Sequence, residues 1–281
     1  MNYRTTTLIC NEDNRVFPLL GSEFAPSNAL PVRCVFRLHA ANTKVTCHRH
    51  AWDQMIFSDR GVVRVTTTRA TYTVPPWRAV WIPAGVSHSA ALLETAHLCS
   101  LQLLPGCMER VPEKCVDLSP WLGCRVIEVR PLLRELVKAL AMENIEDISA
   151  RRYESYCSLI LLEIIGAPAC PLMVPLPSER RLRSFCDSFM KQPSLARSLD
   201  EMAREAGASV STINRLFHTE LGSRFSVWRK QALLAHALAL SAQGMTLGEI
   251  SYRLGYGNQS AFSAMVRQVM GVSPSEVFAV K

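Results

Sequence analysis

Two segments in the C-terminal third of the chain carry the same series of helix signals, and this repeat constrains the fold more than any other feature. The segments are SLDEMAREAGASVSTINRLFHTELG, residues 198–222, and TLGEISYRLGYGNQSAFSAMVRQVMG, residues 246–271. In the first segment, Glu201 follows Ser198 by three residues. In the second, Glu249 follows Thr246 by three residues. Such a capping box satisfies two free amide groups at the start of a helix, so both segments are expected to begin with a helix.

A glycine and a second N-cap divide each segment into two helices. The first helices are expected to end at Gly207 and Gly255, because glycine adopts the left-handed conformation at little cost. The N-caps and final glycines of the second helices are Ser209 with Gly222 and Asn258 with Gly271. An amphipathic stretch, residues 226–243, lies between the two segments. The pattern predicts helix, short turn and helix, twice, around a connecting helix.

The second helix of each segment has an apolar stripe on one face and small polar side chains on the other. The stripes consist of Ile213, Leu216 and Phe217, and of Phe262, Met265 and Val266. The polar faces consist of Ser211, Thr212, Asn214 and Arg215, and of Gln259, Ser260, Ser263 and Ala264. Short polar side chains let a helix enter the major groove of DNA, where Asn, Gln and Arg read base edges. These polar residues are therefore candidate contacts to double-stranded DNA.

The charge of the chain is compatible with a DNA partner but does not establish one. Residues 178–281 carry +5 of the formal net charge of +7. A solvated basic surface accounts for this charge as well as a polyanion partner does. The alternative to DNA binding is a helical bundle with solvated polar faces. That alternative leaves two capped units of nearly equal length unexplained.

Residues 179–281 resemble the AraC/XylS family of transcription regulators. The resemblance rests on the first repeat, on FSVWRKQ in the connecting helix, and on the closing LGY, SAF and GVSP strings. It implies a double helix-turn-helix domain that sets two recognition helices into successive major grooves of an operator. The base-reading positions it implies are Ser211, Asn214 and Arg215, and Gln259, Ser260 and Ser263. Ala264 departs from the long polar or basic residue common in the family, which favours backbone contacts by the second helix.

The first half of the chain has the sequence pattern of a β-rich domain. From Val32 to Leu104, short β-branched runs such as VRCVFRLH and RAVWIP alternate with turn residues. These runs predict the strands of a small antiparallel barrel or sandwich. From Pro131 the apolar period becomes three or four residues, which predicts helices over 131–141 and 149–165. APACPLMVPLPS, residues 167–178, contains four prolines and is expected to link two domains.

The stretch CHRHAWDQ, residues 47–54, suggests a metal site. HRHAWDQMIFSDRG and WRAVWIPAGVSHS resemble the two motifs of the cupin barrel. On that resemblance the ligands are His48, His50, Gln54 and His88. Three imidazoles and one oxygen suit a single divalent transition metal: Zn, Fe, Mn or Ni. His48 and His50 are two residues apart, so they are expected to point to the same side of one strand.

Three departures from the cupin motifs leave a second interpretation open. Gln54 replaces a glutamate, Trp77 a glycine and Leu92 an asparagine. An amide oxygen lacks the charge of a carboxylate, so it attracts a dication less. The alternative is a ligand pocket in which the same polar residues form hydrogen bonds. Its apolar walls are then expected from Trp52, Trp77 and Trp81.

The expected architecture is an α+β protein of two domains. Its parts are a cupin-like antiparallel β-barrel (1–130), a helical dimerisation or packing segment (131–166), a Pro-rich linker (167–178) and an all-α double helix-turn-helix domain (179–281). No window is apolar enough for a membrane span, and the N-terminus lacks a signal-peptide core, so a cytoplasmic location is expected. The apolar stripe of residues 149–165, which includes Ile160 and Leu161, is expected either to cover the barrel or to pair two chains in a homodimer.

The expected function is sequence-specific transcription regulation controlled by a small-molecule effector in the cupin domain. An activator would also contact RNA polymerase. The resemblance to cupin-sensor regulators implies a nearby transporter or efflux gene as a target. One alternative is a ligand-independent regulator whose cupin serves only dimerisation. A metal-dependent cupin enzyme is another, although the residues offer no acid–base pair beyond the expected ligands and Asp53, which alternation points outward.

Overall fold

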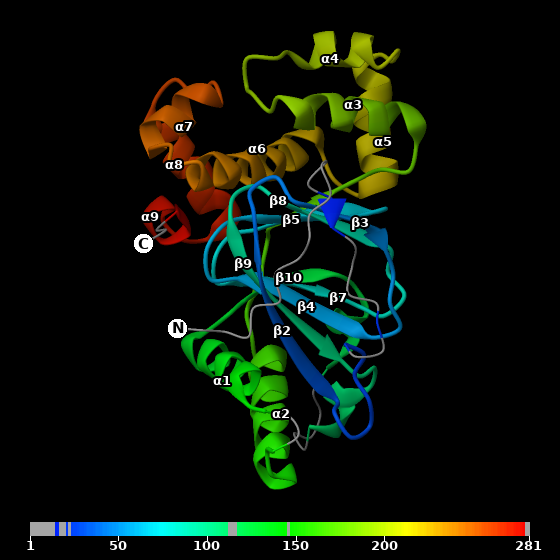
Figure 1. The fold of residues 1–281 in the computed structure, drawn as a ribbon. Helices are drawn as coiled ribbons and strands as arrows, with labels where there is room; N and C mark the ends of the chain where they lie inside the picture. Colours follow the sequence, from blue (N-terminus) through cyan, green and yellow to red (C-terminus); the bar gives the residue numbers. More distant parts are fainter. Residues whose placement is uncertain (1–14, 17–20, 22–23, 112–116, 145–146, 279–281) are drawn as a thin grey trace. The chain divides into compact units, whose positions relative to one another are not determined.

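The chain forms two compact units, shown in Figure 1. The computed structural model describes residues 15–16, 21, 24–111, 117–144 and 147–278. One unit comprises Met1–Val65 and Val74–Cys170, and the other comprises Thr66–Thr73 and Pro171–Lys281. The division after Cys170 falls inside the segment expected to be a linker. The helices expected over 131–165 belong to the first unit.

The strands of the first unit form two sheets. They are β1 (Arg15–Val16), β2 (Val32–His39), β3 (Lys44–His48), β4 (Asp53–Ser58), β5 (Val63–Thr67), β7 (Arg78–Ile82), β8 (His88–Leu92), β9 (Ala96–Leu103), β10 (Arg125–Glu128) and β11 (Ala169–Cys170). One sheet has the order β1-β3-β8-β5, and the other β11-β10-β7-β4-β9-β2. The second sheet is antiparallel throughout, whereas β1 and β3 are parallel. The β-rich unit is confirmed, but its described strands form a cupin-like pair of sheets and not a closed barrel.

The two faces of the second sheet have different neighbours. Successive side chains of a strand point to opposite faces, so Gln54 and Met55 in β4 are on opposite sides. Met55 lies in register with Trp81 and Leu101. All three are buried in one apolar cluster with residues of α1 (Pro131–Met142) and α2 (Ala150–Ile165). Gln54 therefore faces away from these helices.

The apolar stripe of α2 faces the core of its own unit. Tyr153, Cys157, Ile160, Leu161 and Ile164 are buried in the cluster that contains Met55 and Trp81. The Tyr153 hydroxyl donates to the carbonyl of Val32 at 2.6 Å. Of the two roles expected for the stripe, packing against the β-domain is confirmed. A two-fold contact through Ile160 and Leu161 is excluded, because both side chains are already covered within one chain.

The second unit is helical, as expected. Its helices are α3 (Arg180–Lys191), α4 (Leu199–Glu205), α5 (Val210–Leu221), α6 (Phe225–Ala242), α7 (Leu247–Arg253), α8 (Gln259–Met270) and α9 (Pro274–Phe278). α4 with α5 and α7 with α8 are the two expected helix–turn–helix pairs, and α6 is the connecting helix. Aromatic rings of α3, α5 and α6 form much of its core. These rings are Phe185, Phe189, Phe217, Phe225 and Trp228.

The segment expected to be a linker is built into sheets. β11 pairs with β10 in the first unit. In the second unit, β12 (Met173–Pro175) pairs antiparallel with β6 (Ala70–Val74). The indole nitrogen of Trp228 donates to the Pro175 carbonyl at 2.8 Å, which ties β12 to α6. The prolines exclude a helix here, but they do not prevent short strands.

None of the helices in the described ranges is both long and apolar enough to cross a membrane.

Candidate functional site

Three histidine side chains of the first unit converge on one point. His48 ends β3, His88 begins β8, and the two are cross-strand partners. His50 follows β3 in the loop before β4, so it does not share a strand with His48 as expected. The ligand atoms of His48, His50 and His88 nevertheless lie within 4.8 Å of one another. The expected histidine cluster is therefore present, with one member supplied by a loop.

Each ring is oriented by a hydrogen bond from Nδ1 to a backbone carbonyl. His48 Nδ1 lies 2.8 Å from the Thr46 carbonyl oxygen, and His88 Nδ1 lies 3.0 Å from that of Val86. His50 Nδ1 lies 2.6 Å from the carbonyl oxygen of Trp52. A carbonyl oxygen only accepts, so Nδ1 carries the proton in all three rings. In a neutral ring with this proton on Nδ1, Nε2 is an acceptor, which is the usual arrangement of metal-binding histidines.

Burial keeps two of these imidazoles neutral. It lowers the pKa of His48, and it lowers that of His88 to about 4, although the hydrogen bond to Val86 opposes the shift. His88 is 1% exposed, and its Nε2 atom has no hydrogen-bond partner among the described residues. A buried acceptor without a partner is costly. A bound cation, or a donor group on a ligand, would satisfy it.

Gln54 joins the cluster from the second sheet. Its Oε1 lies 2.9 Å from His50 Nε2, while its amide nitrogen donates to Ser100 Oγ at 2.7 Å. When His50 carries a proton on Nδ1 alone, its Nε2 and Gln54 Oε1 are two acceptor atoms that face each other. Ligand atoms bonded to one ion at about 2.0–2.2 Å lie roughly 3 Å apart, so this spacing suits two ligands of the same cation. The donor set of three imidazole nitrogens and one amide oxygen thus fits a divalent transition metal.

Only one of the three expected tryptophans lies at the histidines. The Trp52 ring stacks on His50, with ring centroids 5.0 Å apart. Trp81 lies on the face that carries Met55, where its indole nitrogen donates to the Trp121 carbonyl at 2.9 Å. The Trp77 ring lies 3.9 Å from the guanidinium carbon of Arg134 in α1. The assignment of Trp77 and Trp81 to the histidine pocket is therefore wrong, because strand alternation and a neighbouring helix place them elsewhere.

The second unit presents two polar helix faces. Ile213, Leu216 and Phe217 are buried in α5, and Phe262, Met265 and Val266 are buried in α8. The expected contacts Ser211, Asn214, Arg215, Gln259 and Ser260 are exposed. Thr212 and Ser263 are half-buried, and Thr212 Oγ1 lies 3.0 Å from Ser209 Oγ at the N-cap of α5. These two are weaker candidates for base reading than their neighbours.

The structure adds His218 and Arg267 to these faces. Both are exposed, and they occupy corresponding positions in α5 and α8. His218 lies seven residues after Ser211, and Arg267 lies seven after Ser260, so each extends the same helical stripe. Arg267 gives α8 a guanidinium one turn beyond Ala264. Neither residue was predicted from the sequence, although the seven-residue spacing was the signal that could have identified both.

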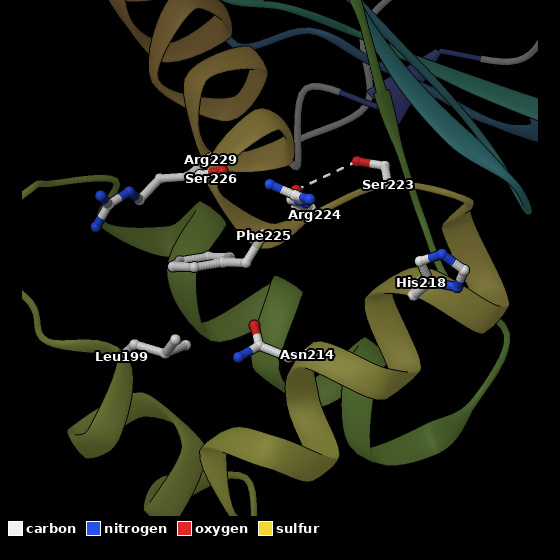
Figure 2. A pocket seen from close by; sticks show the side chains of 8 residues that line it. All are labelled: Leu199, Asn214, His218, Ser223, Arg224, Phe225, Ser226 and Arg229. Carbon is white, nitrogen blue, oxygen red and sulfur yellow. Dashed lines mark hydrogen bonds between the residues drawn. The ribbon is translucent and has the colours of Figure 1, made fainter.

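Asn214 and His218 also line a pocket in front of α5 (Figure 2). The pocket continues to α6, which supplies Ser226 and Arg229, and to its N-cap residue Arg224. The exposed polar face of α5 is therefore bordered on one side by a concave, basic surface.

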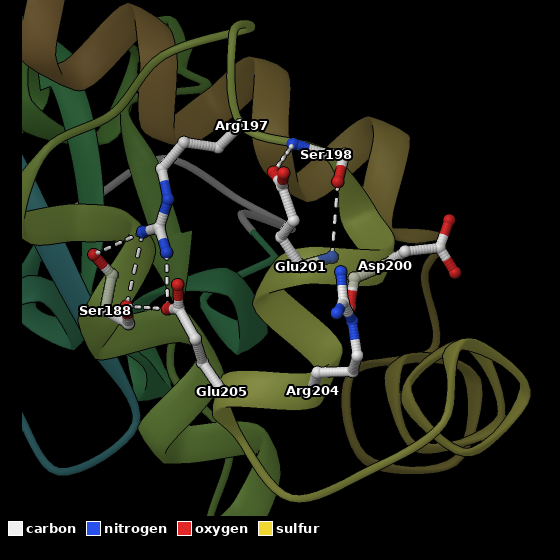
Figure 3. Close-up of polar contacts among 7 residues, drawn as sticks. All are labelled: Ser188, Arg197, Ser198, Asp200, Glu201, Arg204 and Glu205. Carbon is white, nitrogen blue, oxygen red and sulfur yellow. Dashed lines mark hydrogen bonds and ion pairs between the residues drawn. The ribbon is translucent and has the colours of Figure 1, made fainter.

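Local side-chain caps hold α4 and α7 in place. Ser198 Oγ accepts from the Glu201 amide, and the Glu201 carboxylate accepts from the Ser198 amide (Figure 3). Thr246 and Glu249 form the same box at α7. Both expected capping boxes are thus present, and hydrogen bonding lowers the pKa of each glutamate.

Ser198→Ala is expected to lower the unfolding free energy of the second unit by about 1 kcal/mol, because it leaves an amide of α4 without its acceptor. Urea unfolding followed by far-UV circular dichroism measures this loss. Ser211→Ala is the control, since Ser211 lies inside α5 and not at its N-cap. Equal stability of the two variants would show that the capping box contributes nothing.

Comparison with known proteins agrees with both halves. Residues 30–161 match the model of the AraC-like ligand binding domain, and residues 202–279 match a helix-turn-helix domain. The chain belongs to the AraC family. It is a DNA-binding transcription regulator with an N-terminal ligand-binding domain, as the two resemblances implied. The family matches cover both the histidine cluster and the two recognition helices.

The individual proteins that resemble this chain differ in how much of it they match. The HTH-type transcriptional regulator NimR of Escherichia coli (strain K12) is 28% identical over 91% of each chain. The virulence regulon transcriptional activator VirF of Yersinia enterocolitica is 31% identical over 35% of each chain. Among solved structures, ToxT from Vibrio cholerae O395 aligns over 88% of this chain and 97% of its own, with 11% identity and a TM-score of 0.36. The AraC-like transcriptional activator CuxR aligns over 75% and 78%, with 14% identity and a TM-score of 0.38.

Proposed function

We propose that this regulator senses a small molecule at the histidine cluster and that the cluster holds one divalent transition metal: Zn, Fe, Mn or Ni. The observation that carries the metal proposal is the common orientation of the three rings. Each Nδ1 is used by a backbone carbonyl, and one ring nitrogen of each histidine lies within 4.8 Å of those of the other two. The direct measurement is the metal content of the purified protein, compared with that of the His88→Ala variant.

The cluster is proposed to bind an effector between the two sheets. His48 and His88 come from one sheet and Gln54 from the other, so a ligand held there contacts both. We propose recognition without turnover. The nearest acid in sequence, Asp53, is engaged by the Ala84 amide, which donates a hydrogen bond to its carboxylate at 2.8 Å. A cytoplasmic location and control of a nearby transporter or efflux gene remain part of the proposal.

On the DNA side, α5 is proposed to read bases through Arg215. Its exposed guanidinium can bind guanine O6 and N7 in a bidentate manner. Arg215→Ala is expected to cost about 1–3 kcal/mol at the operator and to relax specificity at one base pair. The measurement is selection of binding sites from a random-sequence duplex pool, followed by titration of the selected site.

Arg180→Ala is the matched control, because it removes one exposed guanidinium from α3. It is expected to leave the base preference unchanged. If Arg215→Ala selected the same sites as the unaltered protein, α5 would not be the helix that reads bases at that position.

We propose a homodimer at the operator, and contact with RNA polymerase if the protein activates. Two linked readers bind paired half-sites at a higher effective concentration than single ones. The exposed apolar side chains of Leu132 in α1 and Leu159 in α2 are the candidates for the contact, now that the buried stripe is excluded. Sedimentation of the purified protein measures the oligomeric state.

A further inference from the structure

The pocket beside α5 has a chemical character that base reading alone does not explain. It has a volume of about 560 Å³ and is lined by Leu199, Asn214, His218, Ser223, Arg224, Phe225, Ser226 and Arg229. Figure 2 shows these side chains arranged around one opening, with contributions from α4, α5 and the start of α6. Two of the eight are arginines, and none is acidic. The pocket therefore favours an anion.

Three glutamates on neighbouring helices have partners outside the pocket. Glu201 closes the capping box of α4. Glu205 pairs with Arg197. Glu220 accepts hydrogen bonds from the Ser178 hydroxyl and from the Glu179 amide, at 2.8 and 3.2 Å. No Asp or Glu is among the residues that line the pocket, and these three glutamates are engaged elsewhere.

The two pocket arginines are placed differently. Arg229 is half-buried, and its guanidinium carbon lies 5.2 Å from the centre of the Phe225 ring. Stacking on an aromatic ring fixes the plane of a guanidinium while its N–H groups remain available at the edge. Arg224 is exposed in the turn before α6. One arginine is thus preorganised, and the other is free to close over a bound group.

The pocket is continuous with the recognition face. Asn214 and His218 are one turn apart on α5, and Asn214 is next to the proposed base reader Arg215. A helix that places its side chains against base edges brings its flanks against the sugar–phosphate walls of the groove. A pocket on the flank of α5 is therefore positioned for the backbone and not for the bases.

We propose that this pocket binds one phosphodiester group of the operator, held by the guanidinium groups of Arg224 and Arg229 with the Ser226 hydroxyl and the Asn214 amide as additional donors. The inference rests on DNA binding through α5. It moves Asn214 from base reading to backbone positioning. It also assigns a function to Arg224, Ser226 and Arg229, which the sequence pattern did not single out. Arginine suits a phosphate because its planar fork matches two oxygens at once.

The test compares Arg224→Ala, Arg229→Ala and Arg215→Ala on two probes: the selected operator and a mixed-sequence duplex. Loss of a phosphate contact is expected to weaken binding of both duplexes by the same factor, about tenfold. It should also reduce the slope of log affinity against log salt by about 1. Arg224→Lys keeps the charge and is expected to retain the slope. Arg180→Ala controls for charge removed outside the pocket.

A neutral methylphosphonate placed one linkage at a time locates the contact. At one position flanking the bases that Arg215 reads, the methylphosphonate should weaken DNA binding by the unaltered protein about as much as Arg224→Ala does. The same methylphosphonate should not weaken DNA binding by the Arg224→Ala variant any further. Thermal unfolding checks that each variant is folded.

Three outcomes would overturn the proposal. In the first, a pocket variant changes base preference. In the second, a folded Arg224→Ala variant keeps the DNA affinity and salt slope of the unaltered protein, while Arg215→Ala binds DNA more weakly. This outcome would contradict a phosphate contact in the pocket but leave DNA binding through α5 intact. In the third, inorganic phosphate without DNA raises the melting temperature of the unaltered protein while neither pocket variant loses DNA affinity, which would identify a site for a free anion. Failure of the unaltered protein to bind either duplex would instead count against DNA binding as a whole.

Discussion

Ile160→Glu is expected to leave the first unit unfolded. Ile160 is fully buried in α2, in a cluster that includes Leu133, Val137 and Met55. Its replacement removes an apolar side chain and puts a carboxylate where no partner is available, so the group must be desolvated, protonated or expelled. We expect a cost of more than about 4 kcal/mol, a large part of the roughly 5–15 kcal/mol that stabilises a typical domain. Loss of the near-ultraviolet circular dichroism of the buried tryptophans measures the effect.

The neighbouring residue provides a matched control. Leu159 is 43% exposed on the same helix, so Leu159→Glu is expected to fold and to melt close to the unaltered protein. It also tests the proposed homodimer, because a charge on an exposed contact should yield a folded monomer in sedimentation. A folded Ile160→Glu protein with an unchanged melting temperature would show that α2 does not pack as described.

This pair illustrates what apolar periodicity can and cannot predict. The spacing of apolar residues in α2 identifies a helix and the face it buries. It does not identify what covers that face, because a sheet of the same chain and a second chain offer the same chemistry. Both roles were therefore open for Ile160 and Leu161 until the position of the sheet was known.

The helical repeats were predictable because their signals are local. A capping box such as Ser198 with Glu201 depends on residues three apart, and a glycine such as Gly222 ends a helix through its own conformation, with φ of 59°. Strand runs such as Val32–His39 are local in the same sense, since alternation is visible within one segment.

The surroundings of the histidines were less predictable because they depend on register between strands. Trp81 is next to Ile82 in sequence, but only Ile82 shares a face with Gln54. The two-residue spacing from His48 predicts that His50 lies on the same strand, whereas β3 ends at His48. The three histidines still converge, because His50 reaches the cluster from the loop and its ring donates a hydrogen bond to the Trp52 carbonyl. The cupin motifs therefore predict the residues of the cluster correctly. They do not predict which strand or loop carries each residue, or which side chains surround the cluster.

His88→Ala is expected to abolish retention of the proposed metal. His88 is the most buried of the three rings, and its Nε2 atom has no partner within the described part of the protein. Its loss leaves two imidazoles and an amide oxygen, which lack the charge of a carboxylate to hold a dication. Loss of an outer-shell partner alone costs roughly 10–100-fold in metal affinity, so removal of a ligand should cost at least about 100-fold. Elemental analysis of protein purified without chelator measures the bound metal, with one ion per chain expected before the substitution.

His97→Ala is the control for this prediction, because His97 lies 3.6 Å from Asp59 and outside the cluster. It should keep the metal. Melting temperature gives a second measurement: added Zn²⁺ should raise it for the unaltered protein and for His97→Ala, but not for His88→Ala, because an ion that binds only the folded state stabilises it. The metal proposal would be contradicted by substoichiometric metal in the unaltered protein together with a melting temperature that does not rise with Zn²⁺, Fe²⁺, Mn²⁺ or Ni²⁺. The Gln54 amide would then have to turn and donate to His50 Nε2, since two acceptors 2.9 Å apart cannot stabilise each other. The cluster would in that case be a hydrogen-bonding wall for the effector, with His88 Nε2 as the acceptor for a donor group on the ligand.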